Sequence, residues 1–295
     1  MTAKQLRPLW GSRTYVMGIL NVTPDSFSGD GLLKGTDVVQ AALQQARSFV
    51  SAGADILDIG GESTRPGAKL VTEEEELERV VPVIEALVRT GLGALISVDT
   101  YKAPVAEAAL QAGAHWVNDV WGLRADSAMA AVVARHRVPI VLMHNRSKPG
   151  NAQLEETLGG RYVGMEYDNL LEDVKKELME SVFLAHAAGI RDEDIILDPG
   201  IGFGKTVQQN LELLNRLGEI SALGYPVLLG PSRKSFIGYT LDLPPDQRLE
   251  GTAAAVCVGI LRGADIIRVH DVEFMVRLAR MTDAILGRKL RSGLE

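Results

Sequence analysis

Eight short apolar runs, separated by segments of helical pattern, constrain the fold of this chain most strongly. Each run has the length of a strand, and nearly all end on a residue that can do chemistry. Strands that are buried on both faces and joined through helices are typical of parallel βα units. The sequence therefore predicts an α/β protein, a single (β/α)8 TIM barrel with its active site at the carboxyl-terminal ends of the strands. The runs are 16–20, 56–59, 95–98, 116–117, 140–143, 195–197, 227–230 and 266–269.

Length and composition agree with one compact enzyme. The chain has 295 residues, of which 46% are hydrophobic, so we expect residues 1–295 to form one domain with a core at about 14–286. A net charge of −7 argues against nucleic acid or an anionic membrane as a partner. The lone cysteine, Cys257, lies in an apolar run, which favours a buried thiol in a reducing compartment. Neither a signal-peptide core nor a run of membrane-spanning length is present, so we expect a soluble, cytoplasmic protein.

Polar residues end several of the predicted strands. Asp99, Asn118 and Asp198 follow three different apolar runs. A lone Asp at such a position is commonly a salt-bridge partner or a helix N-cap. Three of them on separate strands favour a ligand that presents paired N–H donors, such as the edge of an aminopyrimidine ring.

Three loops after predicted strands carry further candidate residues. The loop that begins at Asn21 is about twice the usual length, which favours a functional role. Arg65 lies in a glycine-rich loop and could clamp a phosphate or carboxylate, although an ordinary surface arginine is as good an interpretation when it is taken alone. The segment 198–206 resembles a nucleotide-binding loop, but Pro199 stands where that motif needs its first glycine. We therefore expect its glycines to let the backbone approach a flat ligand, with Phe203 as a wall.

Cations and histidines complete the candidate set. Lys234 could hydrogen-bond a ring carbonyl or nitrogen, and Arg268 and His270 alternate on one strand and so share a face. Together these three side chains would form an anion site. Among the histidines, only His144 and His270 follow strands and are functional candidates, and no Cys/His cluster indicates zinc.

Seven of these segments, in this order, resemble the dihydropteroate synthase family over nearly all of residues 14–286. They are Met17-Gly-Ile-Leu-Asn-Val-Thr-Pro-Asp-Ser-Phe-Ser28, Asp58-Ile-Gly-Gly-Glu-Ser-Thr-Arg-Pro-Gly67, Ile96-Ser-Val-Asp-Thr100, Asn118-Asp119, Leu197-Asp-Pro-Gly-Ile-Gly-Phe-Gly-Lys205, Ser232-Arg-Lys-Ser235 and Arg268-Val-His-Asp271.

The resemblance implies a transferase of folate biosynthesis with a pterin-binding barrel. It would join 6-hydroxymethyl-7,8-dihydropterin diphosphate to p-aminobenzoate, giving 7,8-dihydropteroate and pyrophosphate, with Mg2+ as cofactor near Asn21. It also implies a homodimer. Arg65, Lys234, Asp99 and Asp198 would be the catalytic residues. The implied pterin ligands are Asp99, Asn118, Asp198 and Lys234; Thr64, Arg65, Asn21, Arg268 and His270 would face the diphosphate; Ser235, Phe203, Pro66 and Phe27 would frame p-aminobenzoate.

Two other functions compete with this one. A methyltransferase domain that uses methyltetrahydrofolate and a corrinoid protein would share the pterin pocket, but should lack the Pro-Asp-Ser-Phe and Ser-Arg-Lys-Ser segments present here. A non-catalytic pterin-binding partner would be favoured by loss of Asp198, Lys234 or Arg65, and all three are present.

Two further segments lie outside these motifs. Residues 251–261 are apolar on every side, which fits either a subunit interface or buried packing. Residues 145–166 are expected to form an irregular insertion near the barrel mouth, and its Arg146 has no evident role.

Overall fold

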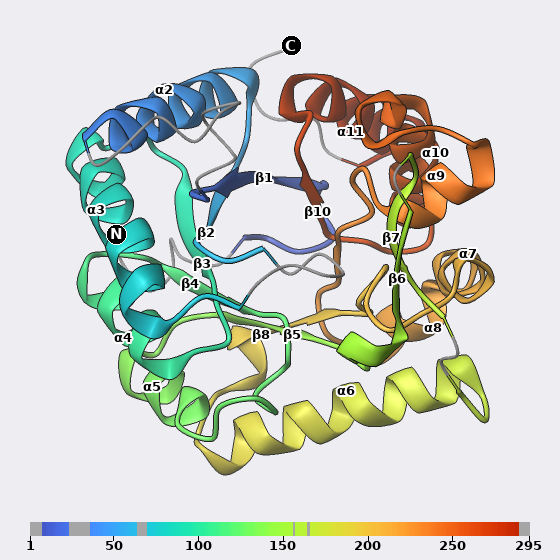
Figure 1. The fold of residues 1–295 in the computed structure, drawn as a ribbon, viewed down its shortest axis with the longest axis horizontal. Helices are drawn as coiled ribbons and strands as arrows, with labels where there is room; N and C mark the ends of the chain where they lie inside the picture. Colours follow the sequence, from blue (N-terminus) through green and yellow to red (C-terminus); the bar gives the residue numbers. More distant parts are fainter. Residues whose placement is uncertain (1–7, 24–35, 64–69, 156, 164–165, 289–295) are drawn as a thin grey trace.

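The fold is an eight-stranded, all-parallel β-barrel ringed by helices (Figure 1). The strand order is β8-β5-β4-β3-β2-β1-β10-β9, and a parallel bridge between Leu197 and Val227 joins the two ends of the sheet. The predicted barrel is confirmed. The computed structural model describes residues 8–23, 36–63, 70–155, 157–163 and 166–288.

Each predicted apolar run forms a strand of this barrel. The run predicted at 227–230 pairs over only two residues, and the short fourth strand is extended by the polar residues Asn118 and Asp119. The strands are β1 (Tyr15–Asn21), β2 (Ile56–Gly60), β3 (Leu95–Asp99), β4 (Trp116–Asp119), β5 (Ile140–Met143), β8 (Ile195–Asp198), β9 (Leu228–Leu229) and β10 (Ile266–Val269).

Helices cover the outer face of the barrel because every second strand residue points outward into an apolar layer. They are α2 (Thr36–Ala52), α3 (Glu73–Thr90), α4 (Ala103–Gln111), α5 (Met129–His136), α6 (Leu170–Ala187), α7 (Val207–Asn215), α8 (Gly218–Ser221), α9 (Ser235–Leu241), α10 (Leu249–Leu261) and α11 (Val272–Ile285). No helix among these described segments is both long and apolar enough to cross a membrane.

The alternate strand residues point inward and form layers. The lower layer is apolar and includes Met17, Ile56, Trp116 and Ile266, all fully buried. This plug fills the amino-terminal side of the barrel, and in this architecture ligands bind at the carboxyl ends of the strands.

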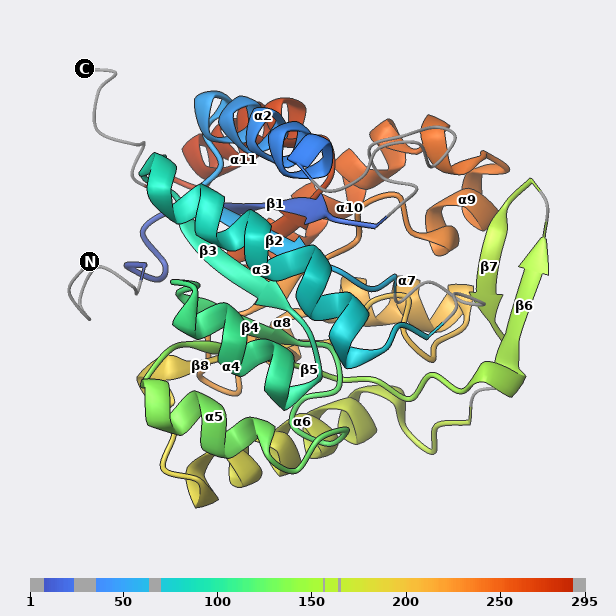
Figure 2. The same cartoon turned by 60° about the vertical axis from the view of Figure 1, so that its left-hand side comes forward.

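The prediction of an irregular insertion at 145–166 is wrong. The segment contains an antiparallel hairpin, β6 (Ala152–Glu155) and β7 (Gly159–Tyr162). Figure 2 shows the hairpin beyond the barrel, on the side toward which β1 points. It is held against α9, where Tyr239 donates a hydrogen bond to the Gly159 carbonyl (3.2 Å) and Arg161 stacks on the Tyr239 ring. The sequence obscured the hairpin because each of its strands is only four residues long and β7 begins with two glycines.

Candidate active site

The carboxyl ends of four neighbouring strands place polar side chains in one row. The sheet register pairs Asn21 with Gly60, Gly60 with Asp99, and Asp99 with Asn118. Gly60 has no side chain and so leaves a gap in this row. A Cβ at this position would lie 3.5 Å from the Asp99 Cβ and 3.8 Å from the Asn21 Oδ1. The barrel therefore gathers Asn21, Asp99 and Asn118 at its mouth, as the sequence predicts for strand-end residues.

Beneath this row lies Asp58, which is completely buried and was missed by the sequence reasoning. Its Oδ2 accepts hydrogen bonds from the Arg268 Nε (2.6 Å) and from the Asn118 Nδ2 (2.9 Å). The signal was available, since a carboxylate stands in the middle of the apolar run 56–59, on the same face as Gly60. Asp58 thus fixes two of the predicted site residues from below.

Arg268 contacts both the buried Asp58 and Asp99 at the mouth of the barrel. Besides Asp58, its guanidinium contacts the Asp99 Oδ2 through Nη2 (2.6 Å). Burial opposes its charge, but the carboxylates of Asp58 and Asp99 raise the pKa of Arg268 above its ordinary value. The predicted anion site of Lys234, Arg268 and His270 is therefore more complex than expected, because Arg268 is already paired with two carboxylates.

Two carboxyl groups of the site, those of Asp99 and Asp198, have pKa values above their ordinary range. Burial raises the pKa of Asp99 to about 7, with the charge of Arg268 opposing the rise. Burial also raises the pKa of Asp198, although the backbone N–H of Gly200 donates to its Oδ1 (2.7 Å) and acts the other way. Such desolvated acids are typical of a site that awaits a hydrogen-bonding ligand.

Lys234 lies over the ring of Phe203, with its Nζ 3.9 Å from the ring centroid. The same Nζ donates a hydrogen bond to the Ile201 carbonyl. Burial lowers the pKa of Lys234 to about 7, while the Asp198 carboxylate acts in the opposite direction. The structure therefore brings together Lys234, Phe203 and Asp198, as the sequence predicts.

The glycines of the 198–206 loop allow close packing within the protein itself. Gly200, Gly202 and Gly204 have φ of 70°, 82° and 60°, and a Cβ on them would lie 1.8 Å from the His144 carbonyl oxygen, 2.5 Å from the Lys234 Cδ and 2.4 Å from the Arg146 carbonyl carbon. These close approaches are to the protein itself rather than to open space. The glycines thus allow the loop to pack between β5 and Lys234.

His270 and Ser235 are both connected to the segment that carries Lys234. The His270 Nδ1 and the Ser232 Oγ are 3.0 Å apart, and the Ser232 Oγ also accepts from the His270 backbone N–H. Ser235 is half-buried and begins α9 directly after Lys234. Four further predicted site residues, Phe27, Thr64, Arg65 and Pro66, lie outside the described residues.

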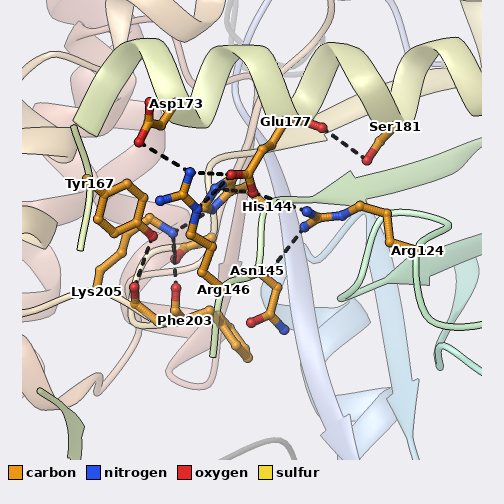
Figure 3. Close-up of polar contacts among 12 residues, drawn as sticks. Arg124, His144, Asn145, Arg146, Tyr167, Asp173, Glu177, Ser181, Phe203 and Lys205 are labelled. Atoms are coloured by element: carbon orange, nitrogen blue, oxygen red, sulfur yellow. Dashed lines mark hydrogen bonds and ion pairs between the residues drawn. The ribbon is translucent and has the colours of Figure 1, made fainter. Parts of the chain in front are cut away.

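His144, the other candidate histidine, is buried beside α6 (Figure 3). Its Nδ1 lies 2.9 Å from the Lys205 Nζ and its Nε2 lies 3.1 Å from the Glu177 Oε2. Burial lowers the pKa of His144 to about 3, so the ring is neutral at physiological pH. His144 therefore supports the site from behind instead of facing the mouth.

Arg146 joins the two ends of the 145–166 insertion to α6 (Figure 3). Its guanidinium bonds the Glu177 Oε1 (2.6 Å), the Asp173 Oδ2 (3.2 Å) and the Glu166 carbonyl (2.9 Å), and it stacks on the Tyr167 ring. These contacts give a structural role to a cation that the sequence left unexplained.

The acidic and amide side chains at the barrel mouth are also candidates for binding a metal ion. Within the described part of the chain, no group of three or more His, Cys, Asp or Glu side chains is arranged to hold a metal ion. The amide oxygen of Asn21 stands in the row at the barrel mouth, beside Gly60. Such a position suits Mg2+ that arrives with substrate phosphates, because Mg2+ usually takes only one or two protein oxygens.

Comparisons with known proteins agree with this geometry. A family model described as "Pterin binding enzyme" matches residues 17–270. The chain is 53% identical to the dihydropteroate synthase of Bacillus subtilis over 94% of this chain and 90% of that protein, and 41% identical to the Escherichia coli protein over 94% of each. A dihydropteroate synthase from Clostridium difficile, solved in the presence of pteroic acid, is 49% identical and superposes with a TM-score of 0.86 over 96% of this chain and all of that one. Another from Xanthomonas albilineans, solved with 4-aminobenzoic acid, is 44% identical with a TM-score of 0.82 over 93% of each chain. This chain belongs to the dihydropteroate synthase family of pterin-binding enzymes.

Proposed function

We propose that Asp99, Asn118, Asp198 and Lys234 hold the pterin while this enzyme carries out the reaction of its family. That reaction condenses 6-hydroxymethyl-7,8-dihydropterin diphosphate with p-aminobenzoate to give 7,8-dihydropteroate and pyrophosphate, a step of folate biosynthesis. The observation that carries the assignment is electrostatic. The Asp198 carboxylate and the Lys234 ammonium each act on the other's pKa at the mouth of the barrel, and the Asp99 carboxylate also acts to raise the pKa of Lys234.

The pterin assignment follows from the donors and acceptors of these groups. A pterin edge presents ring and exocyclic N–H donors that match a carboxylate, and a ring carbonyl and nitrogens that match an ammonium or an amide N–H. Asp198 and Lys234 offer such a pair on one side of the mouth, and Asp99 and Asn118 offer another. Each group is desolvated before the ligand arrives, so pairing with the pterin relieves part of the cost of burial.

The diphosphate belongs at the loop ends above this row. Thr64, Arg65 and His270 would bind the phosphates, with Arg268 balancing Asp58 and Asp99 beneath them. Asn21 would offer its amide oxygen to Mg2+, which when bound would neutralise charge on the departing pyrophosphate. A site with one protein oxygen fits a metal that is held mainly by the substrate.

The remaining residues of the proposed site suit the binding of p-aminobenzoate, the arylamine substrate. Phe203 lies directly beneath Lys234, and Ser235 begins the helix that follows Lys234. A ring stacked beside Phe203 and a carboxylate near Ser235 would place the amine of p-aminobenzoate toward the pterin methylene. Phe27 and Pro66 would complete this frame.

The chemistry needs no covalent nucleophile from the protein. The C–O bond to the diphosphate breaks and pyrophosphate leaves with the electron pair, so positive charge develops on the pterin methylene. Asp99 and Asp198 stabilise that charge, while Arg65 and His270 stabilise the leaving group. The neutral arylamine then forms the new C–N bond and gives up one proton to water or pyrophosphate. The protein acts mainly by orientation and electrostatics.

Residues 14–286 form one barrel domain in this proposal, and the enzyme works as a homodimer in the cytoplasm. Neighbouring helices α10 and α11 expose apolar side chains that would be covered by a second subunit: Val258, Leu261, Phe274, Met281 and Ile285. The half-buried thiol of Cys257, which contacts Thr282, fits a reducing compartment.

The first experiment is to measure pyrophosphate release with Mg2+ and the pterin diphosphate, with and without p-aminobenzoate. We expect release that depends on p-aminobenzoate, together with formation of dihydropteroate, and we expect Lys234→Ala to abolish turnover in a folded protein. Pterin binding without product would favour a non-catalytic or methyl-transfer role. Full activity of Lys234→Ala would contradict the site assignment.

A further inference from the structure

A continuous chain of polar contacts runs from α6 to the loop that carries Phe203 (Figure 3). Glu177, on α6, contacts the Nε2 of His144 at 3.1 Å, and the Nδ1 of His144 lies 2.9 Å from the Lys205 Nζ. The Lys205 Nζ also donates to the carbonyls of Gly200 (2.9 Å) and Phe203 (3.1 Å). None of these three ionisable side chains is used in the chemistry described above.

Two arrangements of protons are compatible with these contacts. The Nε2 of His144 makes no hydrogen bond within the described residues, although the Glu177 Oε2 lies 3.1 Å away. If Lys205 is an ammonium, it donates to the Nδ1 of His144 and to both loop carbonyls, and the His144 proton is on Nε2, facing Glu177. If Lys205 is a neutral amine, it accepts from an Nδ1–H instead. Burial lowers the pKa of Lys205 well below its ordinary value and Asp198 opposes this shift; the coupling of Glu177 to the loop requires the ammonium form.

Glu177 is itself held in the ionised form. Its partial burial acts the other way, but the neighbouring His144 ring and the hydrogen-bonded Arg146 guanidinium lower the pKa of Glu177 below its ordinary range. Arg124 contributes a further contact to the Glu177 Oε2 (3.1 Å). The Glu177 carboxylate, at one end of this series of contacts, is therefore held in place by the guanidinium groups of Arg124 and Arg146.

A second contact fixes the far end of the same loop. Tyr167, stacked under the Arg146 guanidinium, donates its hydroxyl to the Gly204 carbonyl (2.9 Å). Lys205 and Tyr167 together bind three carbonyls within five consecutive residues, Gly200 to Gly204. A loop with three left-handed glycines has little stiffness of its own, so these contacts determine its path.

The path of the loop decides the geometry of the pterin site. The Ile201 carbonyl, between the two carbonyls held by Lys205, accepts the hydrogen bond from Lys234, and the Phe203 ring lies beneath the same ammonium. The Gly200 N–H is bound to Asp198. A shift of this loop would therefore move the partners of both Lys234 and Asp198.

We propose that Glu177, His144 and Lys205 are positioning residues of the pterin site, which hold the 200–204 loop so that Lys234 and Phe203 keep their geometry. The inference rests on the proposed assignment of Lys234 and Phe203 to the substrates. The three residues act in series, so a substitution at any one of them removes most of the restraint that the three together place on the 200–204 loop.

The test is a double-mutant cycle between Glu177→Gln and Lys205→Met, with Glu180→Gln as the matched control. Glu180 lies on the same helix and is exposed. We expect Glu177→Gln to raise the KM for the pterin diphosphate about 10-fold, as substitutions of supporting partners commonly do, with a smaller effect on kcat. The double variant should be no more than about 2-fold worse in kcat/KM than Lys205→Met alone, because coupled residues are not additive. Losses that multiply, or a Glu177→Gln enzyme that matches Glu180→Gln, would overturn the proposal.

A second measurement does not depend on turnover or on the folding of Lys205→Met. 15N-histidine NMR of the unmodified protein at pH 7 should show His144 as a neutral ring protonated on Nε2. A ring protonated on Nδ1, or on both nitrogens, would refute the proton arrangement. Absence of turnover in the unmodified enzyme would count against the proposed function instead, because the tautomer and the affinity for 6-hydroxymethylpterin can still be measured.

Discussion

Arg268 reaches from β10 past β1 to Asp58 in β2, where its Nε lies 2.6 Å from the Asp58 Oδ2. The pair is separated by 210 residues along the chain, and Asp58 is completely buried. A buried ion pair of this kind adds little stability beyond apolar packing, but it leaves a costly charge when one partner is removed. Its main effect is to fix Arg268 and Asn118 at the mouth of the barrel.

Asp58→Asn is therefore expected to lower both stability and pterin affinity. The substitution keeps the shape but removes the charge opposite Arg268, and we expect a loss of about 3 kcal/mol in the free energy of unfolding. Urea denaturation measures this, and titration with 6-hydroxymethylpterin measures the affinity. Asp246→Asn, at an exposed position, serves as control and should change stability by less than about 0.5 kcal/mol. Equal stabilities for the two variants would show that Asp58 carries no such role.

The dependence of kcat/KM on pH should be bell-shaped, with its maximum near neutral pH. Asp99, whose pKa is raised to about 7, loses its carboxylate charge as the pH falls, and Lys234, whose pKa is lowered to about 7, loses its ammonium charge as the pH rises. Both charges are needed to pair with the pterin, so activity declines on either side. Because the two groups interact, the limbs describe the pair rather than either residue alone.

Two variants test which residue is responsible for each limb of the pH profile. Lys234→Arg keeps a positive charge at alkaline pH, so the alkaline limb should disappear even if overall activity is lower. Asp99→Asn should instead remove the acidic limb. Steady-state kinetics from pH 5 to 9 decide the matter, and an alkaline limb that persists in Lys234→Arg would mean that another group titrates there.

Gly202→Ala should impair substrate binding more than it impairs folding. Its Cβ would lie 2.5 Å from the Lys234 Cδ, which is the movable part of a side chain and must shift. Gly224→Ala is the matched control, since Gly224 has a φ of 89° and open space around the position of a Cβ. Both variants share a backbone strain of roughly 1 kcal/mol, so only the Lys234 contact separates them. A KM for the pterin diphosphate that rises equally in both would exclude the contact as the cause.

Magnesium dependence should weaken when Asn21 is replaced. Asn21→Ala removes the amide oxygen at the end of β1, and we expect about a 10-fold higher Mg2+ concentration for half-maximal activity. Binding of 6-hydroxymethylpterin without a diphosphate should stay independent of Mg2+ in both proteins. If Asn21→Ala leaves the Mg2+ requirement unchanged, the ion is held by other groups.

The proposed dimer can be tested on the exposed apolar faces of α10 and α11. Leu261 and Met281 are 56% and 63% exposed, and the combined variant Leu261→Asp, Met281→Asp should sediment as a monomer, because burying two carboxylates in an interface is costly. Phe183→Asp, on α6 and 71% exposed in the unmodified chain, should leave the oligomeric state unchanged. An unmodified protein that sediments as a monomer at micromolar concentration would contradict the dimer directly.

Most of the architecture can be predicted because it depends on local patterns in the sequence. Parallel strands that are buried on both faces appear as apolar runs, and residues that end such strands must meet at one rim. For that reason the barrel and the gathering of Asp99, Asn118 and Asn21 follow from the sequence. The β6–β7 hairpin does not, because the alternation in β6, Ala-Gln-Leu-Glu, spans only four residues and β7 begins with two glycines, so neither run differs clearly from a loop.

What the sequence alone determined is the order of the βα units, the residues at their ends and, through seven ordered motifs, the family. What only the tertiary structure decided is the pairing of those residues across the barrel. Asp58 with Arg268 and His144 with Lys205 are joined over 210 and 61 residues, and no local spacing encodes such contacts. Their protonation was equally hidden, because a pKa depends on burial and on neighbouring charges that exist only once the strands have closed into a barrel.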